Sequence, residues 1–240
     1  MAPVAQPATE LTPRSEGARQ YQACMALARQ DPKAAHESAL AWRQNGGGSP
    51  ATHCIAVALL GLGQHHLSGQ MLEELAERTA TSRVTLKAGL LSQAANAWLI
   101  AGQARRSEKL LSEALSLTPR NVDILIDRSV ARATLEKYFD ALDDLNEALE
   151  IMPGREDALT FRASAWRRVD ALDLAEKDVA EALERRPDYP EALLERGLIH
   201  KTKGDIILAR ADWLRVLDIA VEGPLTEAAR RNLQSLNEKK

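Results

Sequence analysis

Residues 190–216 read PEALLERGLIHKTKGDIILARADWLRV, and this stretch decides the fold. Two amphipathic runs rich in alanine and leucine are separated by a polar break at Lys203-Gly204. In the first run, the large Leu193 is followed four residues later by Gly197, which has no side chain. Two antiparallel helices that pack closely need such a pair, because the small residue lets the neighbouring backbone approach. The stretch therefore predicts a helical hairpin.

The hairpin recurs along the chain with a period of 34 residues. Pro119, Pro153 and Pro187 follow one another at this spacing. Five further columns keep the same period and nearly the same side-chain size: Leu91, Leu125, Leu159 and Leu193; Ala95, Ser129, Ala163 and Gly197; Ser107, Ala141, Ala175 and Ala209; Leu111, Leu145, Val179 and Trp213; Ala114, Ala148, Ala182 and Val216. Chance does not align so many columns, so we infer an internal repeat.

The repeat resembles the tetratricopeptide repeat, in which each unit is a helix–turn–helix hairpin. In the unit that starts at Pro190, the signature positions of that family are held by Leu193, Arg196, Gly197, His200, Ala209, Trp213 and Val216. The resemblance covers about residues 17–238 and implies an all-α, right-handed α-solenoid. It places about six hairpins at residues 17–48, 49–81, 88–121, 122–155, 156–189 and 190–223, and a capping helix at 224–238.

The N-terminal part departs from the family spacing. Gly46-Gly47-Gly48 separates the first two hairpins, and an insertion of about five residues before Ala88 is expected to lengthen the first helix of the third hairpin. Residues 1–16 contain three prolines and neither a charged n-region nor an apolar h-region, so we interpret them as a disordered leader. They could equally be the start of a mature chain whose signal peptide has been removed.

The charge and hydropathy of the chain exclude several kinds of partner. A formal net charge of −3 provides no basic field for nucleic acid or for an anionic membrane surface. The sequence has no run of about 18 apolar residues, so we expect no membrane insertion. The expected partner is a protein or a peptide, and we expect neither nucleic acid nor a small-molecule substrate.

No feature of the sequence predicts an enzyme. Gly46–Gly48 and Gly61-Leu62-Gly63 follow no expected strand and lack the Gly-Lys-Ser/Thr sequence that holds phosphate and magnesium. His53 and His65 are 12 residues apart, about 18 Å along a helix, and cannot share an ion. We therefore expect no catalytic residue, no cofactor and no metal.

Arginine and aspartate form two further columns with the period of the repeat. Arg128, Arg162 and Arg196 fall on the first helices of the last three hairpins, and Asp144, Asp178 and Asp212 fall on the second helices. We predict a repeated internal ion pair that contributes to the specificity of packing. The alternative is an arginine ladder that binds a polyanion, although the matching aspartates would neutralise it.

In the tetratricopeptide-repeat family, the first helix of each hairpin lines a concave groove. The resemblance therefore predicts a peptide-binding groove that contains Tyr21, His53, Asn96, Ile126, Asp127, Val130, Thr160, Ser164, Arg167, Leu194, Leu198 and Lys201. It implies a non-catalytic scaffold or adaptor that binds a protein or peptide with apolar anchors and some basic character. The alternative is a structural subunit of a larger envelope complex, or a self-assembling protein. Asp127 stands where a clamp for a Glu-Glu-Val-Asp tail needs an amide or a cation, so that ligand is not supported.

The two cysteines bear on the cellular compartment. The repeat register places Cys24 and Cys54 on the first helices of two neighbouring hairpins, so a disulfide is geometrically possible. Such bonds persist in oxidising compartments, which favours a bacterial periplasmic or exported protein. The alternative is a cytoplasmic chain with two buried free thiols.

Overall fold

The computed structural model describes residues 16–236, and these residues form helices and no strand. The all-α prediction is confirmed for this part of the chain. Most of the predicted leader lies outside the described residues; its last residue, Glu16, is inside them and begins the first helix. Residues 237 and 238 of the predicted cap also lie outside the described part.

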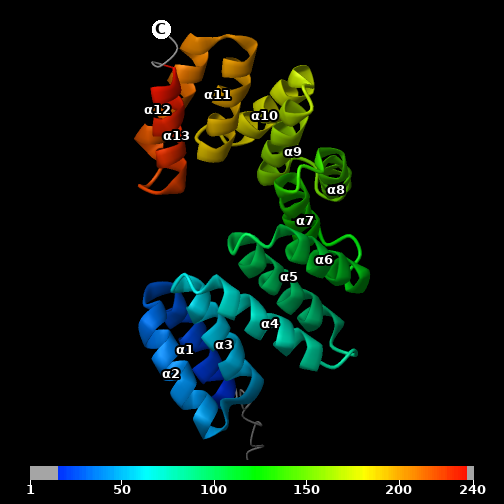
Figure 1. Ribbon diagram of the computed structural model, residues 1–240, viewed down its shortest axis with the longest axis vertical. Coiled ribbons are helices and arrows are strands. Elements are labelled where there is room, and N and C mark those ends of the chain that lie inside the picture. Colours follow the sequence, from blue (N-terminus) through cyan, green and yellow to red (C-terminus); the bar gives the residue numbers. More distant parts are fainter. Residues whose placement is uncertain (1–15, 237–240) are drawn as a thin grey trace, which may run out of the picture. The chain divides into compact units, whose positions relative to one another are not determined.

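The chain divides into two compact units after Arg78, and Figure 1 labels their helices. Unit 1 contains α1 (Glu16–Gln30), α2 (Pro32–Trp42), the π-helical turn η1 (Arg43–Gly47), α3 (Gly48–Gly61) and α4 (His65–Arg78). Unit 2 contains α5 (Val84–Ile100), α6 (Ala104–Leu117), α7 (Val122–Thr134), α8 (Tyr138–Ile151), α9 (Glu156–Arg168), α10 (Leu172–Arg185), α11 (Pro190–Lys203), α12 (Ile206–Ile219) and α13 (Pro224–Ser235). Consecutive helices pair as hairpins, from α1 with α2 to α11 with α12, and α13 follows the last hairpin.

The five columns of the repeat form the core of unit 2. Their side chains expose at most 3% of their surface, and Gly197 is buried as well. A Cβ atom placed on Gly197 would clash with the indole ring of Trp213, so the largest residue of one column faces the smallest residue of another. Trp213 Nε1 also donates a hydrogen bond to the carbonyl oxygen of Leu194 at 3.2 Å. The columns keep their side-chain size because each helix pair fills the same space.

One residue in each hairpin turn of unit 2 adopts the left-handed backbone conformation. Gly102, Glu136, Asp170 and Gly204 have φ angles of 77°, 62°, 63° and 92°. Their sequence numbers show the 34-residue period. For a residue with a Cβ atom this region costs about 1–2 kcal/mol, so Glu136 and Asp170 are held there by the packing around the turn.

Local contacts fix several helix starts. Asp31 caps α2 by accepting a hydrogen bond from the Ala34 backbone N–H at 3.0 Å, and Pro32 is the first residue of that helix. Asn121 caps α7 in the same way through the Ile124 N–H at 3.2 Å. These contacts satisfy backbone donors that have no partner within the helix.

The departures from the family spacing have clear structural forms. α5 starts at Val84 and contains 17 residues, so the predicted insertion lengthens this helix. Between α2 and α3, the backbone leaves the helical conformation at Asn45 and Gly46, and the φ angle of 90° at Gly46 favours glycine. The glycine-rich stretch therefore separates the first two hairpins.

Candidate functional site

One predicted groove position recurs on successive first helices of unit 2 and forms a continuous row. α7 packs against α9, and α9 packs against α11. Val130, Ser164 and Leu198 occupy equivalent repeat positions on these helices and are half-buried, while Asn96 at the same position on α5 is exposed. We call Asn96, Val130, Ser164 and Leu198 the first-helix row. The row offers solvent-accessible polar and apolar side chains on successive helices.

A surface pocket of about 370 Å³ borders this row between α7, α8 and α9. Val130 on α7 and Ser164 and Arg167 on α9 line it, so the structure brings these three predicted groove residues together. Phe161, which is 40% exposed, and Tyr138 contribute aromatic surface to the same pocket. The pocket therefore combines apolar walls with hydroxyl and guanidinium groups.

Asp127 is a predicted groove residue on α7 and is largely buried. Its carboxylate accepts a hydrogen bond from Ser92 Oγ at 3.0 Å. Burial raises the pKa of Asp127 above its ordinary value, the Ser92 hydrogen bond offsets part of this rise, and the carboxylates of Asp123 and Asp157 add to it. Arg155 binds Asp123 and Asp157, each at 2.8 Å, which leaves Asp127 with a hydroxyl as its hydrogen-bond donor.

The two predicted cations of the groove already have partners within the chain. Arg167 Nε donates to Glu195 Oε1 on α11 at 2.5 Å. Lys201 Nζ donates to Ser235 Oγ on α13 at 2.7 Å and lies 6.0 Å from the centre of the Trp213 ring. α13 therefore engages the end of the first-helix face at α11.

Two predicted groove residues are not accessible, which corrects the sequence-based expectation. Ile126 exposes 5% and Thr160 exposes 6% of its surface. Both occupy the fifth position of the unit. Leu194, at the same position on α11, is half-buried.

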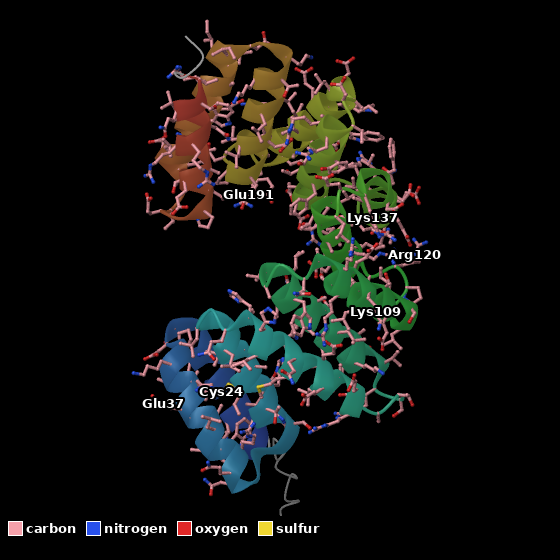
Figure 2. All side chains as sticks on the ribbon, viewed as in Figure 1. Cys24, Glu37, Lys109, Arg120, Lys137 and Glu191 are labelled. Carbon is pink, nitrogen blue, oxygen red and sulfur yellow. A yellow bond between two sulfur atoms is a disulfide. The ribbon has the colours of Figure 1, made fainter. Side chains whose placement is uncertain are left out.

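Unit 1 brings the other two predicted groove residues into contact with each other. The Tyr21 hydroxyl and His53 Nδ1 are 2.7 Å apart, and burial raises the pKa of Tyr21. Nearby, Cys24 on α1 and Cys54 on α3 form a disulfide with a Cα–Cα distance of 6.2 Å, and Figure 2 labels Cys24 at this bond. The first helices of the two hairpins are thus covalently joined.

Each arginine of the repeated column forms two hydrogen bonds with the aspartate of its own hairpin. The Nη2–Oδ1 distances are 2.6 Å for Arg128–Asp144, 2.7 Å for Arg162–Asp178 and 2.6 Å for Arg196–Asp212. In each pair Nε makes the second bond. The three aspartates are buried, so the guanidinium groups face into the helix pair. This arrangement does not present an arginine ladder to a polyanion.

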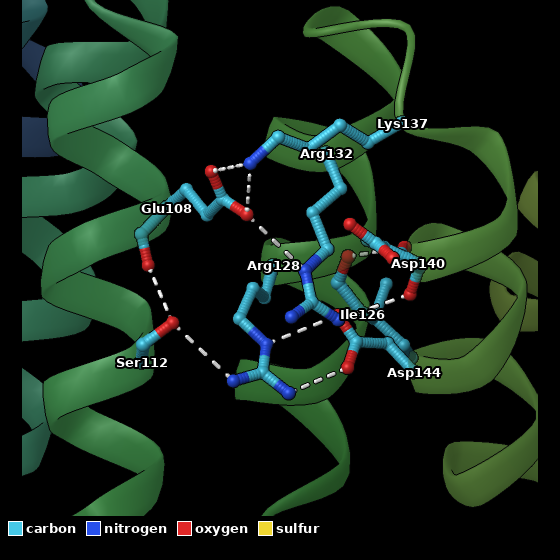
Figure 3. Close-up of polar contacts among 9 residues, drawn as sticks. Glu108, Ser112, Ile126, Arg128, Arg132, Lys137, Asp140 and Asp144 are labelled. Carbon is cyan, nitrogen blue, oxygen red and sulfur yellow. Dashed lines mark hydrogen bonds and ion pairs between the residues drawn. The ribbon is translucent and has the colours of Figure 1, made fainter.

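Arg132 and Glu108 extend the first of these ion pairs, and sequence reasoning missed them. Figure 3 shows Arg128 and Arg132 converging on Asp144, with Arg132 Nη1 at 2.8 Å from Asp144 Oδ2. Glu108 on α6 accepts a hydrogen bond from Lys137 Nζ at 2.7 Å and lies 3.4 Å from Arg132 Nε. The cations Lys137 and Arg132 outweigh the cost of burial and lower the pKa of Glu108. The next hairpin has tryptophan at the equivalent of Arg132, so no periodic signal could reveal this network.

The described residues contain no group of three His, Cys, Asp or Glu side chains arranged to hold a metal ion. Within residues 16–236, no helix has the length and apolar character needed to cross a membrane.

No protein-family sequence model and no curated protein sequence matches the chain. Solved structures do match. The chain is similar to TTC0263, a thermophilic TPR protein in Thermus thermophilus, with 18% identity, coverage of 79% of this chain and 100% of that chain, and a TM-score of 0.67.

Two other solved structures are also similar. MamA, residues 41 to the end, from Desulfovibrio magneticus RS-1 is 17% identical, and the match covers 71% of this chain and 94% of that one with a TM-score of 0.59. YrrB, a TPR protein with an unusual peptide-binding site, is 18% identical, and the match covers 80% and 96% with a TM-score of 0.53. At these identities the likeness concerns the fold.

Proposed function

This chain is an α-solenoid with the tetratricopeptide-repeat fold, and from that fold we propose that it is a non-catalytic scaffold that binds a segment of a partner protein. The segment would lie along the first-helix row of unit 2 and place one side chain in the adjoining pocket. A fold alone does not define a function, so the proposal depends on the chemistry of this surface.

The observation that carries the proposal is the pocket between α7, α8 and α9. Its volume of about 370 Å³ suits a single large side chain. Phe161 and Val130 offer apolar contact, and Ser164 provides a hydroxyl for orientation. The similar protein YrrB has a peptide-binding site, which supports a peptide as the class of ligand.

Asp127 adds a preference for a basic residue in the bound segment. This carboxylate is largely buried and has Ser92 as its hydrogen-bond donor, while Arg155 is occupied by Asp123 and Asp157. A lysine or arginine placed near Asp127 would offset the burial of its charge. The proposed segment therefore carries an apolar anchor close to a cation.

Site-specific photo-crosslinking tests the proposal. A crosslinkable amino acid at Val130 reports on the row, and one at the exposed Asp143 on α8 serves as the control position. We expect Val130 to capture a defined segment of one protein. A synthetic copy of that segment should bind the purified chain. Val130→Asp should weaken binding by about tenfold or more, because apolar contact is lost and the apolar anchor would have to desolvate the new carboxylate.

Three results would contradict this proposal. Equal capture from Val130 and Asp143, or an unchanged Kd in the Val130→Asp variant, would move binding away from the row. Capture of a second copy of the chain from Val130, together with a molecular mass that rises with concentration, would favour a self-assembling structural subunit.

We also propose that the protein works in an oxidising compartment, such as the periplasm or the exterior of a bacterium. The support is the disulfide between Cys24 and Cys54, because such bonds are rare in the reducing cytoplasm. Alkylation of denatured extracts made under acid quench should find both thiols unreactive before reduction. Two reactive thiols would place the chain in the cytoplasm.

A further inference from the structure

The first turns of α8, α10 and α12 expose large apolar side chains. Fourteen such side chains are exposed in residues 16–236, and five of them lie in these three turns. They are Phe139 on α8, Leu174 on α10, and Ile206, Ile207 and Leu208 on α12, with exposed fractions from 41% for Ile206 to 84% for Ile207. Single exposed apolar residues are ordinary on protein surfaces, but a concentration in three short segments indicates an interaction surface.

Contacts between the hairpins show that these three turns are neighbours. Arg168, the last residue of α9, donates a hydrogen bond to the hydroxyl of Tyr138, the first residue of α8, and its guanidinium lies 5.0 Å from the centre of that ring. Lys203, the last residue of α11, donates to Glu176 on α10 at 2.7 Å. Each turn is thus joined to the start of the preceding second helix. We call residues 136–140, 170–174 and 204–208 together the turn edge.

The turn edge is acidic as well as apolar. It contains one basic residue, Lys137, whose Nζ is bound to Glu108 at 2.7 Å, and five acidic residues. These are Glu136, Asp140, Asp170, Asp173 and Asp205. All five are exposed, and Asp173 lies 3.7 Å from Lys203 Nζ, so the field of the other four reaches any partner that covers the apolar side chains. A partner with basic residues beside its apolar face is therefore complementary, whereas an anionic membrane surface is repelled.

We propose that the turn edge is a second interaction surface and that it binds a basic amphipathic helix of a partner protein. An α-helix rises about 1.5 Å per residue. A helix laid along the edge therefore presents apolar residues from several successive turns of one face to the three hairpins. Lysine or arginine on its flanks faces the acidic residues, as in other complexes of an amphipathic helix with an apolar surface. This surface adjoins the pocket beside the first-helix row, since Glu136 and Tyr138 line that pocket and also lie in the turn edge.

A pair of synthetic probes tests the proposal with the full chain. Each probe is a helix of about 20 residues with leucines along one face, and the flanking residues are lysine in one probe and glutamate in the other. Fluorescence anisotropy at low and high salt gives the Kd. We expect the lysine probe to bind at least about tenfold more tightly than the glutamate probe, and salt to weaken its binding.

Substitutions on the edge identify the site of binding. The variant with Phe139→Ser, Ile207→Ser and Leu208→Ser should raise the Kd of the lysine probe by about tenfold or more, because it removes most of the apolar contact area. Leu214→Ser is the matched control, since Leu214 is a 52% exposed leucine on α12 outside the edge, and it should leave the Kd unchanged. Circular dichroism checks that each variant retains its helix content.

Four outcomes would overturn the proposal. The first is equal binding of the two probes, and the second is a Kd that the edge substitutions leave unchanged. The third is loss of binding in Val130→Asp with no loss in the edge variant, which would assign the helix to the first-helix row. The fourth is a dimer in sedimentation experiments that the edge substitutions abolish, which would make a second copy of the chain the occupant.

Discussion

Unit 1 and unit 2 join their successive hairpins by different means. In unit 1, the disulfide between Cys24 and Cys54 links α1 to α3. In unit 2, arginines of the first helices reach back to the preceding hairpin: Arg128 Nη1 contacts Ser112 Oγ on α6 at 3.3 Å, and Arg162 Nη1 donates to Asn146 Oδ1 on α8 at 3.0 Å. Unit 1 thus has a covalent bond in addition to the contact between Tyr21 and His53, whereas the contacts named in unit 2 are all between polar side chains.

The disulfide and the polar side chains stabilise the fold through different states of the chain. A disulfide stabilises mainly by restricting the unfolded chain, and it contributes only while it is oxidised. A buried ion pair acts in the folded state, where the loss of one partner leaves the other charge without compensation. The comparison therefore predicts that reduction lowers the stability of unit 1 and that the removal of single charges lowers the stability of unit 2.

The largest effect is expected from reduction of the disulfide. The bond spans a sequence separation of 30 residues. The chain-entropy model gives about 3.5 kcal/mol for a loop of that size, so reduction should lower the unfolding free energy of unit 1 by about this amount. Hydrogen exchange followed by mass spectrometry measures each helix separately, and we expect faster exchange in α1–α4 with little change in α7–α12.

The double variant Cys24→Ala, Cys54→Ala separates the bond from the reducing agent. It should reproduce the faster exchange in α1–α4 and should no longer respond to reduction. Equal loss of protection in both units would show that they unfold together, and the contrast between them would then be lost.

Removal of Asp144 is expected to have the largest effect of any single charge in unit 2. Its carboxylate is buried, accepts hydrogen bonds from Arg128 and binds Arg132 as well. Asp144→Ala leaves two partly buried guanidinium groups without this partner, so we expect a loss of about 3 kcal/mol. Asp178→Ala should cost less, about 2 kcal/mol, because it leaves Arg162 alone. Chemical denaturation measures both losses.

A paired replacement gives the control for this prediction. Arg162→Met combined with Asp178→Leu removes both charges and retains much of the side-chain volume, and its stability should lie within about 1 kcal/mol of the original chain. If the double replacement costs as much as Asp178→Ala alone, packing and not the unpaired charge explains the loss.

The sequence predicted the fold well where the residue type is set by packing. Leu91, Leu125, Leu159 and Leu193 recur because each must fill the same buried space, and the small residues that face them recur for the same reason. The period of the repeat therefore predicted the hairpins directly. Glu136 shows the limit of this reasoning, since its left-handed φ angle is imposed by the turn, whereas Gly102 and Gly204 at equivalent positions are residues that favour this conformation.

The candidate site was harder to predict because exposure depends on contacts between hairpins. Ile126 and Val130 are four residues apart on α7, yet Ile126 is buried and Val130 remains accessible beside the pocket. The repeat register of a single hairpin gives both positions the same expected exposure, so it could not predict this difference in burial. Lys201 was predicted as a groove residue, with packing of groove residues against the terminal segments of the chain as the alternative. Ser235 on α13 engages it, and the repeat register could not specify this contact because α13 lies outside the repeat.

The smallest predicted effect is on Asp127. It extends the comparison to a carboxylate without an arginine partner. Burial raises its pKa in the folded chain. Between the ordinary pKa of the unfolded chain and this raised value, the folded state keeps a proton that the unfolded state has lost. The contribution of Asp127 to the unfolding free energy therefore falls as the pH rises through this window. Above the window, the destabilisation by the buried charge is fully present.

Asp127→Asn removes that cost and keeps an oxygen that can accept the Ser92 hydrogen bond. The variant should be slightly more stable than the original chain at pH 7, and the difference should shrink to zero as the pH falls below the window. Denaturation curves across this pH range measure the difference, with Asp143→Asn on the exposed side of α8 as the control. A gain that persists unchanged at low pH would trace to packing, because a protonated carboxyl and an amide then carry the same charge. A loss of stability at pH 7 would mean that the folded chain stabilises the charged carboxylate of Asp127 as fully as that of Asp144. A basic residue of a partner protein would then find no uncompensated charge at Asp127.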